Sequence, residues 1–221
     1  MGDLEDDLVA VTKELLVDDL IMAYRNGIFP WPIDNEENVV PWFAPQDRGL
    51  LEFKDLHIPR SLEKLLKKKR FKVSFCQNFE EVIELCEKTP RKGQPGTWIN
   101  EEIKKTYTKL FKMKKAYSVE VWKQINTSDR KLVGGLYGVI SDKYVSGESM
   151  FFLESGASKV ALVSLVKRLE SLGLSFLDTQ MVTPLLESFG AVEVSKNRFM
   201  KMIEEGIVLD EDFFDKLSQG A

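Results

Sequence analysis

Apolar residues recur at helical spacing near the start of the chain, within 15–27. The residues that share this spacing are Leu15, Leu16, Leu20, Ile21 and Tyr24. The segment ends in Asn-Gly, which is typical of a helix terminus, and 28–49 then contains four prolines, which do not continue a helix. We therefore expect a small amino-terminal domain over 1–45 and a main domain over 46–221.

Helical periodicity returns in several later segments. The longest of them begins near Ser155, carries an apolar stripe and closes at Gly173. Asn78, Asn100 and Ser155 stand where helix N-caps are expected. Besides this long helix, the expected helices are 60–69, 78–88, 100–114, 184–190 and 196–205.

From Tyr117 onward the pattern changes to alternation of apolar and polar residues. Three alternating runs, at 117–122, 132–140 and 143–151, are separated by short polar segments, which is typical of strands joined by hairpin turns. Two further strands are expected, at 71–75 and 174–180. With no internal repeat in the chain, these elements predict a mixed α+β fold that contains an antiparallel sheet.

The composition is that of a soluble globular protein, with 221 residues, 43% hydrophobic and 30% charged. The formal net charge of −4 is unevenly distributed. Residues 1–20 carry −6 and residues 204–221 carry −5, which leaves +7 for the body of the chain. The segment 60–72 alone carries +6. It is either a solvated helix face or a phosphate-binding surface, because Lys and Arg near a polyanion release its counterions.

The scarcity of histidine and cysteine excludes several kinds of site. His57 is the only histidine, which rules out any metal or catalytic site with two, and we expect no metal. It lies upstream of Ser149, which argues against a Ser-His-Asp triad built on the Gly-Glu-Ser run at 147–149. Cys76 and Cys86 lack C-x-x-C spacing, which predicts reduced thiols.

The amino terminus carries acids where a secretory signal carries basic residues. No run of the sequence approaches the roughly 18 apolar residues of a membrane span, and Asp6 stands where a myristoylation signal needs Ser or Thr. We therefore expect a cytoplasmic protein that has no membrane partner.

Two acids and an amide are the candidate reactive groups. Asp178 and Gln180 are two residues apart on an expected strand, which places their side chains on one face, at the end of an apolar run. A carboxylate beside an amide is suited to holding a nucleophilic amine, whereas an exposed strand end is the plainer interpretation. Glu148, within an otherwise apolar strand, is the second acid that we expect in a pocket.

Aromatic residues gather in loops and at helix ends instead of strand interiors. They are Tyr24, Phe29, Trp31, Trp42, Phe43, Trp98 and Tyr107. Loop aromatics of this kind either pin a contact between domains or stack on nucleobases, which present a flat face. The pattern alone leaves both interpretations open.

Five stretches of the chain, in this order, match one known family. They are MAYRNGIFPW (22–31), PWFAPQDRG (41–49), HIPRS (57–61), GTWIN (96–100) and, within 120–180, EVW, LVGGLYGV, SGESMF, ASK and FLDTQ. On these motifs the chain resembles the leucyl/phenylalanyl-tRNA–protein transferases, which place Leu or Phe from aminoacyl-tRNA on the amino terminus of a protein.

The resemblance implies a small amino-terminal domain packed on a carboxy-terminal domain with the acetyltransferase-like (GNAT) fold. It implies a peptide bond formed without ATP, coenzyme A or any other cofactor, because the aminoacyl ester is already activated. The implied partners are Leu-tRNA and Phe-tRNA, with Met tolerated, and acceptor proteins that begin with Arg or Lys and are thereby marked for N-degron degradation. We expect a monomer.

The family's functional positions carry over to this sequence residue by residue. The implied catalytic residues are Asp178, Gln180 and Glu148, and the implied aminoacyl-adenosine site holds Tyr24, Trp31, Trp98 and Tyr107. The implied pocket for the aminoacyl side chain holds Leu136, Val145, Met150, Leu162, Leu165 and Leu169. The implied tRNA-binding helix carries Arg60, Lys64, Lys67 and Lys68.

The chain departs from the family pattern at two places near these residues. Thr183-Pro184-Leu185 replaces the usual Asn-x-His after the catalytic strand, and Leu136 stands where Met is common. Two alternatives therefore accompany the transferase: a GNAT-type acyl-CoA N-acyltransferase and a noncatalytic tRNA-binding homologue. The first needs a glycine-rich pyrophosphate loop, and 154–159 is poor in glycine.

Overall fold

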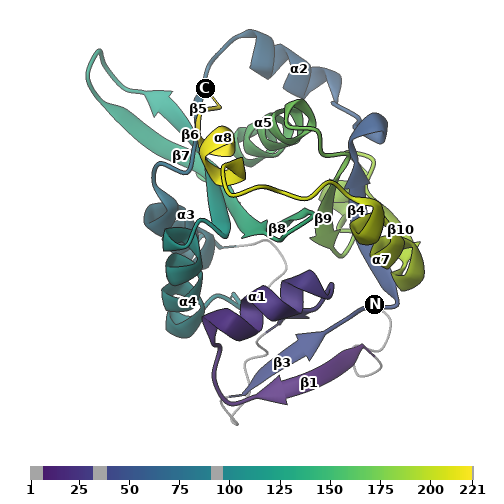
Figure 1. Ribbon diagram of the computed structural model, residues 1–221. Coiled ribbons are helices and arrows are strands. Elements are labelled where there is room, and N and C mark those ends of the chain that lie inside the picture. Colours follow the sequence, from purple (N-terminus) through teal and green to yellow (C-terminus); the bar gives the residue numbers. More distant parts are fainter. Residues whose placement is uncertain (1–6, 32–38, 91–96, 221) are drawn as a thin grey trace.

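The computed structural model describes residues 7–31, 39–90 and 97–220 (Figure 1). At the amino-terminal end, helix α1 (Val17–Arg25) packs on a small antiparallel sheet. Within the described residues this sheet has three strands, in the order β1 (Leu8–Thr12), β3 (Val40–Phe43) and β2 (Phe29–Pro30). A small amino-terminal unit with one helix is thus confirmed. Strands β2 and β3 escape the sequence pattern because each contains a proline, and β1 was not predicted either.

A larger sheet forms the centre of the molecule and has seven strands in the part of the chain that the structure describes. Their order is β10 (Val192–Ser195), β4 (Asp47–Glu52), β9 (Phe176–Gln180), β8 (Val145–Phe152), β7 (Arg130–Ile140), β6 (Ala116–Gln124) and β5 (Lys72–Phe75). All neighbours run antiparallel except β8 and β9, which are parallel and joined through helix α5 (Ala157–Ser171). The antiparallel arrangement expected for the three alternating runs is confirmed.

Alternation in the central strands sends side chains to two helical layers. On one face, Val119 and Leu136 belong to the hydrophobic cluster that includes α5. On the other face, Tyr137 and Phe151 pack with helices α3 (Phe79–Lys88) and α4 (Glu101–Lys112). In Figure 1, α5 lies above strand β8 and α1 lies below it. The mixed α+β fold is therefore confirmed, with helices on both faces of the sheet.

The remaining helices are α2 (Arg60–Lys67), the 3₁₀ turn η1 (Phe53–Asp55), α6 (Pro184–Glu187), α7 (Lys196–Glu205) and α8 (Phe213–Ser218). The helix expected at 196–205 is confirmed as α7, whereas α2 and α6 are shorter than the sequence pattern suggests. The helix expected to reach residue 69 ends at Lys67, because Lys69 takes a left-handed φ of 47°. The helix expected at 184–190 is confined to a single turn before Gly190, whose φ is 95°.

The helix caps follow the sequence only in part. Asn100 is confirmed as an N-cap, since its side chain accepts a hydrogen bond from Ile103 N at 2.9 Å. The expectation that Ser155 caps the long helix is wrong. Gly156 occupies that position with φ 86°, and a Cβ atom there would lie 2.6 Å from Leu65 Cδ2 of helix α2. Glycine permits both the left-handed turn and the close approach of the two helices.

The amino-terminal unit docks on α4 through specific polar contacts. Leu15 N donates to Glu102 Oε1 at 2.8 Å, and Thr106 Oγ1 donates to Leu15 O at 3.1 Å. The hydroxyls of Tyr24 and Tyr107 are 3.0 Å apart and buried. Within the described residues, no helix is long and apolar enough to cross a membrane.

Candidate active site

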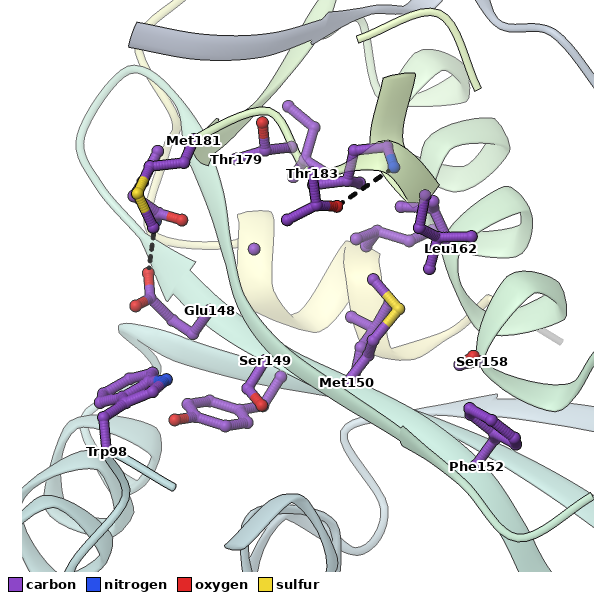
Figure 2. A pocket seen from close by; sticks show the side chains of 18 of the residues that line it. Trp98, Glu148, Ser149, Met150, Phe152, Ser158, Leu162, Thr179, Met181 and Thr183 are labelled. Carbon is purple, nitrogen blue, oxygen red and sulfur yellow. Dashed lines mark hydrogen bonds between the residues drawn. The ribbon is translucent and has the colours of Figure 1, made fainter. Parts of the chain in front are cut away.

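A pocket of about 330 Å³ lies where strands β8 and β9 separate. Their parallel pairing is limited to Ser146 opposite Asp178, and beyond this pair residues of both strands line the pocket. Figure 2 shows Trp98 near Glu148 at one end and Phe152 near Ser158 at the other. Its lining is mostly apolar: Trp31, Trp98, Leu136, Tyr137, Gly147, Glu148, Ser149, Met150, Phe152, Ser158, Leu162, Leu165, Leu177, Thr179, Gln180, Met181, Thr183, Leu185 and Leu186.

Glu148 reaches the pocket because strand β8 is irregular at this residue. Tyr137 pairs with Ser149 and the next residue of β7, Gly138, pairs with Gly147, so Glu148 is the extra residue of a β-bulge. A bulge redirects the side chain of its extra residue. Here Glu148 Oε1 accepts hydrogen bonds from Ser146 Oγ at 2.7 Å and from Gln180 Nε2 at 3.0 Å.

The environment of Glu148 favours its neutral form more than water does. Burial in the apolar pocket raises its pKa to about 7, and the nearby Asp178 carboxylate contributes to the rise. Hydrogen bonds from Ser146 and Tyr24 act in the opposite direction. The carboxyl of Glu148 therefore changes charge close to neutral pH, as expected of a functional group in a pocket.

Gln180 ends strand β9 in an unusual backbone conformation. Its φ is 58°, a left-handed value that costs a non-glycine residue about 1–3 kcal/mol. The chain folds back so closely that a Cβ atom on Gly49 of strand β4 would lie 2.5 Å from the carbonyl carbon of Met181. This bend places the amide of Gln180 in the pocket beside Glu148.

Asp178 is buried, yet it does not line the pocket. Both of its carboxylate oxygens are bound by the Arg48 guanidinium, at 2.8 Å to Nε and 2.7 Å to Nη2. Oδ1 also accepts a hydrogen bond from Gln180 N at 3.0 Å. Asp178 and Gln180 are 0% and 5% exposed, so the alternative of an exposed strand end is wrong.

The four expected aromatics separate into two pairs. The indoles of Trp31 and Trp98 are stacked, with ring centroids 5.8 Å apart, and both line the pocket. Tyr24 and Tyr107 are buried beneath the surface and line no part of it. Burial raises the pKa of both phenols well above the usual value, with the Glu148 carboxylate adding to the effect, so they stay protonated at neutral pH.

Four of the six residues expected in the side-chain pocket lie in its wall: Leu136, Met150, Leu162 and Leu165. Val145 and Leu169 lie instead in the buried cluster against α5 and outside the pocket lining. The resemblance assigns these residues by motif position, which does not fix whether a side chain reaches the pocket surface or is buried behind it.

Sequence reasoning missed part of the wall. Leu177 and Thr179 precede and follow Asp178 on strand β9, and their side chains reach the pocket on the side opposite Arg48. Thr183 and Leu185, noted only as departures from the family pattern, also line it. Thr183 is the N-cap of α6, since its Oγ1 accepts from Leu186 N at 3.3 Å. The apolar run next to Asp178 was the available signal for Leu177.

The expected basic helix is α2, and its charged residues are exposed. Leu62 is its buried anchor, whereas Arg60, Lys64, Lys67 and Lys68 face solvent. In the described part of the chain none of these four cations forms an ion pair. Both the solvated-face and the phosphate-binding interpretations remain compatible with this arrangement.

Comparison with known proteins adds the family. The family model described as "Leucyl/phenylalanyl-tRNA protein transferase" matches residues 50–204, and the model of its N-terminal domain matches residues 13–46. A protein of Hydrogenovibrio crunogenus named "Leucyl/phenylalanyl-tRNA--protein transferase" is 43% identical over 90% of this chain and 75% of its own.

Two further relatives carry the same name. One, from Christiangramia forsetii, is 45% identical over 90% of this chain and 92% of its own length. The other, from Maridesulfovibrio salexigens, is 42% identical over 91% of this chain and 82% of its own length. Identity at this level over most of both chains means that the chain belongs to the leucyl/phenylalanyl-tRNA–protein transferases, a family of aminoacyltransferases.

Proposed function

We propose that this protein transfers Leu or Phe, and to a lesser extent Met, from aminoacyl-tRNA to the α-amine of proteins that begin with Arg or Lys. The observation that carries the proposal is the pocket: an apolar wall ends at the Glu148–Gln180 pair, with the Trp31–Trp98 stack beside it. An apolar side chain fits the wall, its ester lies at the polar pair, and the adenosine packs on the indoles.

The reaction replaces an ester with an amide. The acceptor's amine nitrogen forms a bond to the ester carbonyl carbon, and the bond from that carbon to the ribose oxygen breaks. The released ribose oxygen takes up the proton that the amine loses and becomes a hydroxyl. Gln180 Nε2 is held by Glu148, so we assign Gln180 Oε1 to accept an N–H of the attacking amine. This contact orients the nitrogen and stabilises the positive charge that develops on it.

The acceptor's cationic side chain needs a carboxylate near the amine. Glu148 opens on the pocket, whereas both oxygens of Asp178 are bound by Arg48. We therefore assign the attraction of Arg or Lys to Glu148, and to Asp178 the support of Gln180 through the Gln180 N hydrogen bond. Tyr24, a buried neutral phenol, supports the Glu148 side chain, and Tyr107 supports Tyr24.

The topology agrees with the acetyltransferase-like fold that we propose for residues 46–221. Strands β6, β7 and β8 form an antiparallel meander, helix α5 crosses over, and β9 returns parallel to β8 before the two strands separate around the pocket. Residues 1–45 form the smaller proposed domain. We further propose that the protein acts as a cytoplasmic monomer and that its products are marked for N-degron degradation.

A transfer assay tests the proposal directly. The full chain is incubated with labelled Leu-tRNA or Phe-tRNA and with peptides that begin with Arg, Lys or Ala. We expect label in the Arg and Lys peptides and little in the Ala peptide. Bound tRNA without labelled peptide would favour a noncatalytic tRNA-binding protein, and acetyl transfer from acetyl-coenzyme A would favour an acyl-CoA N-acyltransferase.

Helix α2 is assigned to the acceptor stem of the tRNA, because its unpaired cations release counterions from phosphates. Replacing Lys64, Lys67 and Lys68 with Gln lowers affinity equally for Leu-tRNA and Phe-tRNA. The slope of log affinity against log salt concentration becomes shallower by about two to three. Binding titrations from low to moderate salt measure both quantities.

A matched variant neutralises three exposed lysines on helix α4: Lys105, Lys109 and Lys112. It removes the same charge from another surface and leaves the slope within one of the wild-type value. If both triple variants shift the slope equally, α2 returns to the solvated-face interpretation.

Pocket size sets the choice between Leu and Phe. Leu162 lines the pocket from helix α5, and Leu162→Phe fills part of it. We expect kcat/KM for Phe-tRNA to fall about tenfold relative to that for Leu-tRNA, since shape discrimination in apolar pockets is about 1–3 kcal/mol. Competition between the two aminoacyl-tRNAs measures the ratio. Leu172→Phe, beyond the end of the same helix and outside the pocket lining, leaves the ratio unchanged.

A further inference from the structure

Arg48 is the largest charged side chain in the core and is only 1% exposed. Every part of its guanidinium is in contact with a partner. Nε and Nη2 bind the two oxygens of Asp178, and Nη1 donates to Gly27 O at 2.9 Å. The rings of Phe29 and Phe199 also lie against it, each with its centroid 4.7 Å from Cζ.

These contacts join three segments that lie far apart in the sequence. Gly27 and Phe29 belong to the amino-terminal unit, Phe199 to helix α7, and Asp178 to strand β9. Gly27 has φ 69°, and a Cβ atom there would lie 3.0 Å from Phe199 Cε1. The backbone therefore allows the Gly27 carbonyl to approach the guanidinium closely beside the two rings.

An ion pair at this depth is not the simplest way to stabilise a core. Removing both charges from water is expensive, and well-packed apolar residues of the same volume are often equally stable or more so. The charges are retained here although burial by itself lowers the pKa of Arg48; the facing Asp178 carboxylate outweighs burial and raises it. What the pair supplies beyond packing is orientation, because a bidentate guanidinium fixes both carboxylate oxygens.

The fixed carboxylate bears directly on the proposed reactive amide. Asp178 Oδ1, held by Arg48 Nε, accepts the hydrogen bond from Gln180 N across the left-handed bend at Gln180. That bend brings Gln180 Nε2 to Glu148 Oε1. A chain of three hydrogen bonds thus runs from Arg48 to the pocket, each between 2.8 and 3.0 Å long.

We propose that Arg48 is a positioning residue for aminoacyl transfer, which holds the Gln180 amide in its reactive orientation by fixing both oxygens of Asp178. The inference rests on the proposed function, since it concerns the same pocket. It also gives the amino-terminal unit a part in the reaction: through Gly27 O and Phe29, that unit completes the cage around the guanidinium.

Arg48→Lys is the primary test, because lysine keeps the charge and the aliphatic stem but loses the bidentate fork. We expect kcat for transfer to fall about 100-fold, as for a misplaced reactive group. KM for aminoacyl-tRNA stays within about twofold of the wild-type value, because helix α2 and the Leu/Phe pocket are untouched. Single-turnover rates measured from subsaturating to saturating Phe-tRNA give both quantities, and thermal unfolding is recorded in parallel.

Arg48→Ala adds a readout that loss of stability alone does not produce. Guanidinium ion fits the space between Phe29 and Phe199, so guanidinium chloride well below denaturing concentration restores at least about tenfold in kcat, whereas sodium chloride does not. If Arg48→Ala does not fold, the Lys variant decides. Glu120→Gln is the matched control, because this equally buried carboxylate binds Ser74 and Ser118 away from the pocket, and its kcat stays at the wild-type value.

The outcomes separate the two proposals. A wild-type protein that transfers, with Arg48 variants that fold and keep kcat, overturns the positioning role. The positioning role is also overturned if the Arg48 variants and Glu120→Gln lose the same unfolding temperature and the same kcat, and if guanidinium restores no activity. A wild-type protein that transfers nothing overturns the proposed function, and the role of Arg48 falls with it.

Discussion

Replacing Gln180 with Ala lowers kcat for aminoacyl transfer by about 10²–10³-fold while tRNA affinity stays near the wild-type value. The amide is the group that we assign to the attacking nitrogen, and it lies in the pocket at 3.0 Å from Glu148. Helix α2, the proposed tRNA contact, does not line the pocket. The measurement is a single-turnover rate with saturating aminoacyl-tRNA, paired with a binding titration.

The backbone at this position offers a sharper version of the experiment. Gln180 has φ 58°, which glycine adopts freely and alanine does not. Gln180→Gly therefore removes the same amide without the strain, and its free energy of unfolding is about 1 kcal/mol higher than that of the Ala variant. If the amide acts in the reaction, both variants lose the same rate. Recovery of activity in the Gly variant would contradict the chemical role and leave only a backbone effect.

A control variant checks that loss of a glutamine amide elsewhere is harmless. Gln124, at the exposed end of strand β6, hydrogen-bonds only a local carbonyl among the described residues. Gln124→Ala keeps kcat and KM. Parallel losses of kcat and tRNA affinity in Gln180→Ala would indicate a general disturbance of the fold.

Local patterns in the sequence predict those helices and strands that are determined mainly by neighbouring residues. Alternation at 117–122 and 132–140 follows from strands with two differently packed faces, and the structure has β6 and β7 there. Helix α4 begins at its Asn100 cap, as the sequence indicates. Strand β4 was not predicted, because Arg48 is charged and Gly49 is a poor strand former. Arg48 binds Asp178, and Gly49 leaves room for the close approach of Met181.

The geometry of the site depends on contacts that no local pattern records. Arg48 and Asp178 are 130 residues apart in the sequence, so their pairing follows only from the placement of β4 beside β9. The bulge that redirects Glu148 and the left-handed bend at Gln180 are departures from regular strands, which alternation cannot anticipate. The strand pattern and the motif resemblance both pointed to Asp178, Gln180 and Glu148 as candidate reactive residues, but the hydrogen bonds that connect them with Arg48 come from the structure.

Replacing Glu148 with Gln makes the protein more stable above neutral pH and less active. The pKa of Glu148 is about 7 in the folded chain, whereas an unfolded glutamate titrates near 4.5. Between these two values the folded state binds a proton that the unfolded state lacks, so the free energy of unfolding falls as pH rises. Above about pH 7 the full penalty is present, on the order of 2 kcal/mol for a side chain that keeps some contact with solvent in the pocket.

Denaturant unfolding at pH 5 and pH 8.5 measures this effect. Glu148→Gln removes the titrating group, so the variant gains stability relative to the wild-type protein at pH 8.5 and gains little at pH 5. Glu193→Gln, on the exposed strand β10, gains nothing at either pH. A wild-type protein whose stability does not fall relative to the variant across this range would contradict the buried position of Glu148.

Ionisation of Glu148 lowers stability as pH rises, and we expect it to raise activity over the same range. Glu148 attracts the acceptor's cation only when it is charged, so kcat/KM for a peptide beginning with Arg rises about tenfold from pH 6 to pH 8 beyond the rise caused by the peptide's own α-amine. Glu148→Gln retains the α-amine contribution and loses the rest, and its preference for Arg over Ala peptides shrinks. Parallel pH profiles and equal preferences in the variant and the wild-type protein would mean that the cation is bound by a group other than Glu148. Asp178 does not substitute for Glu148, because Arg48 binds both of its carboxylate oxygens.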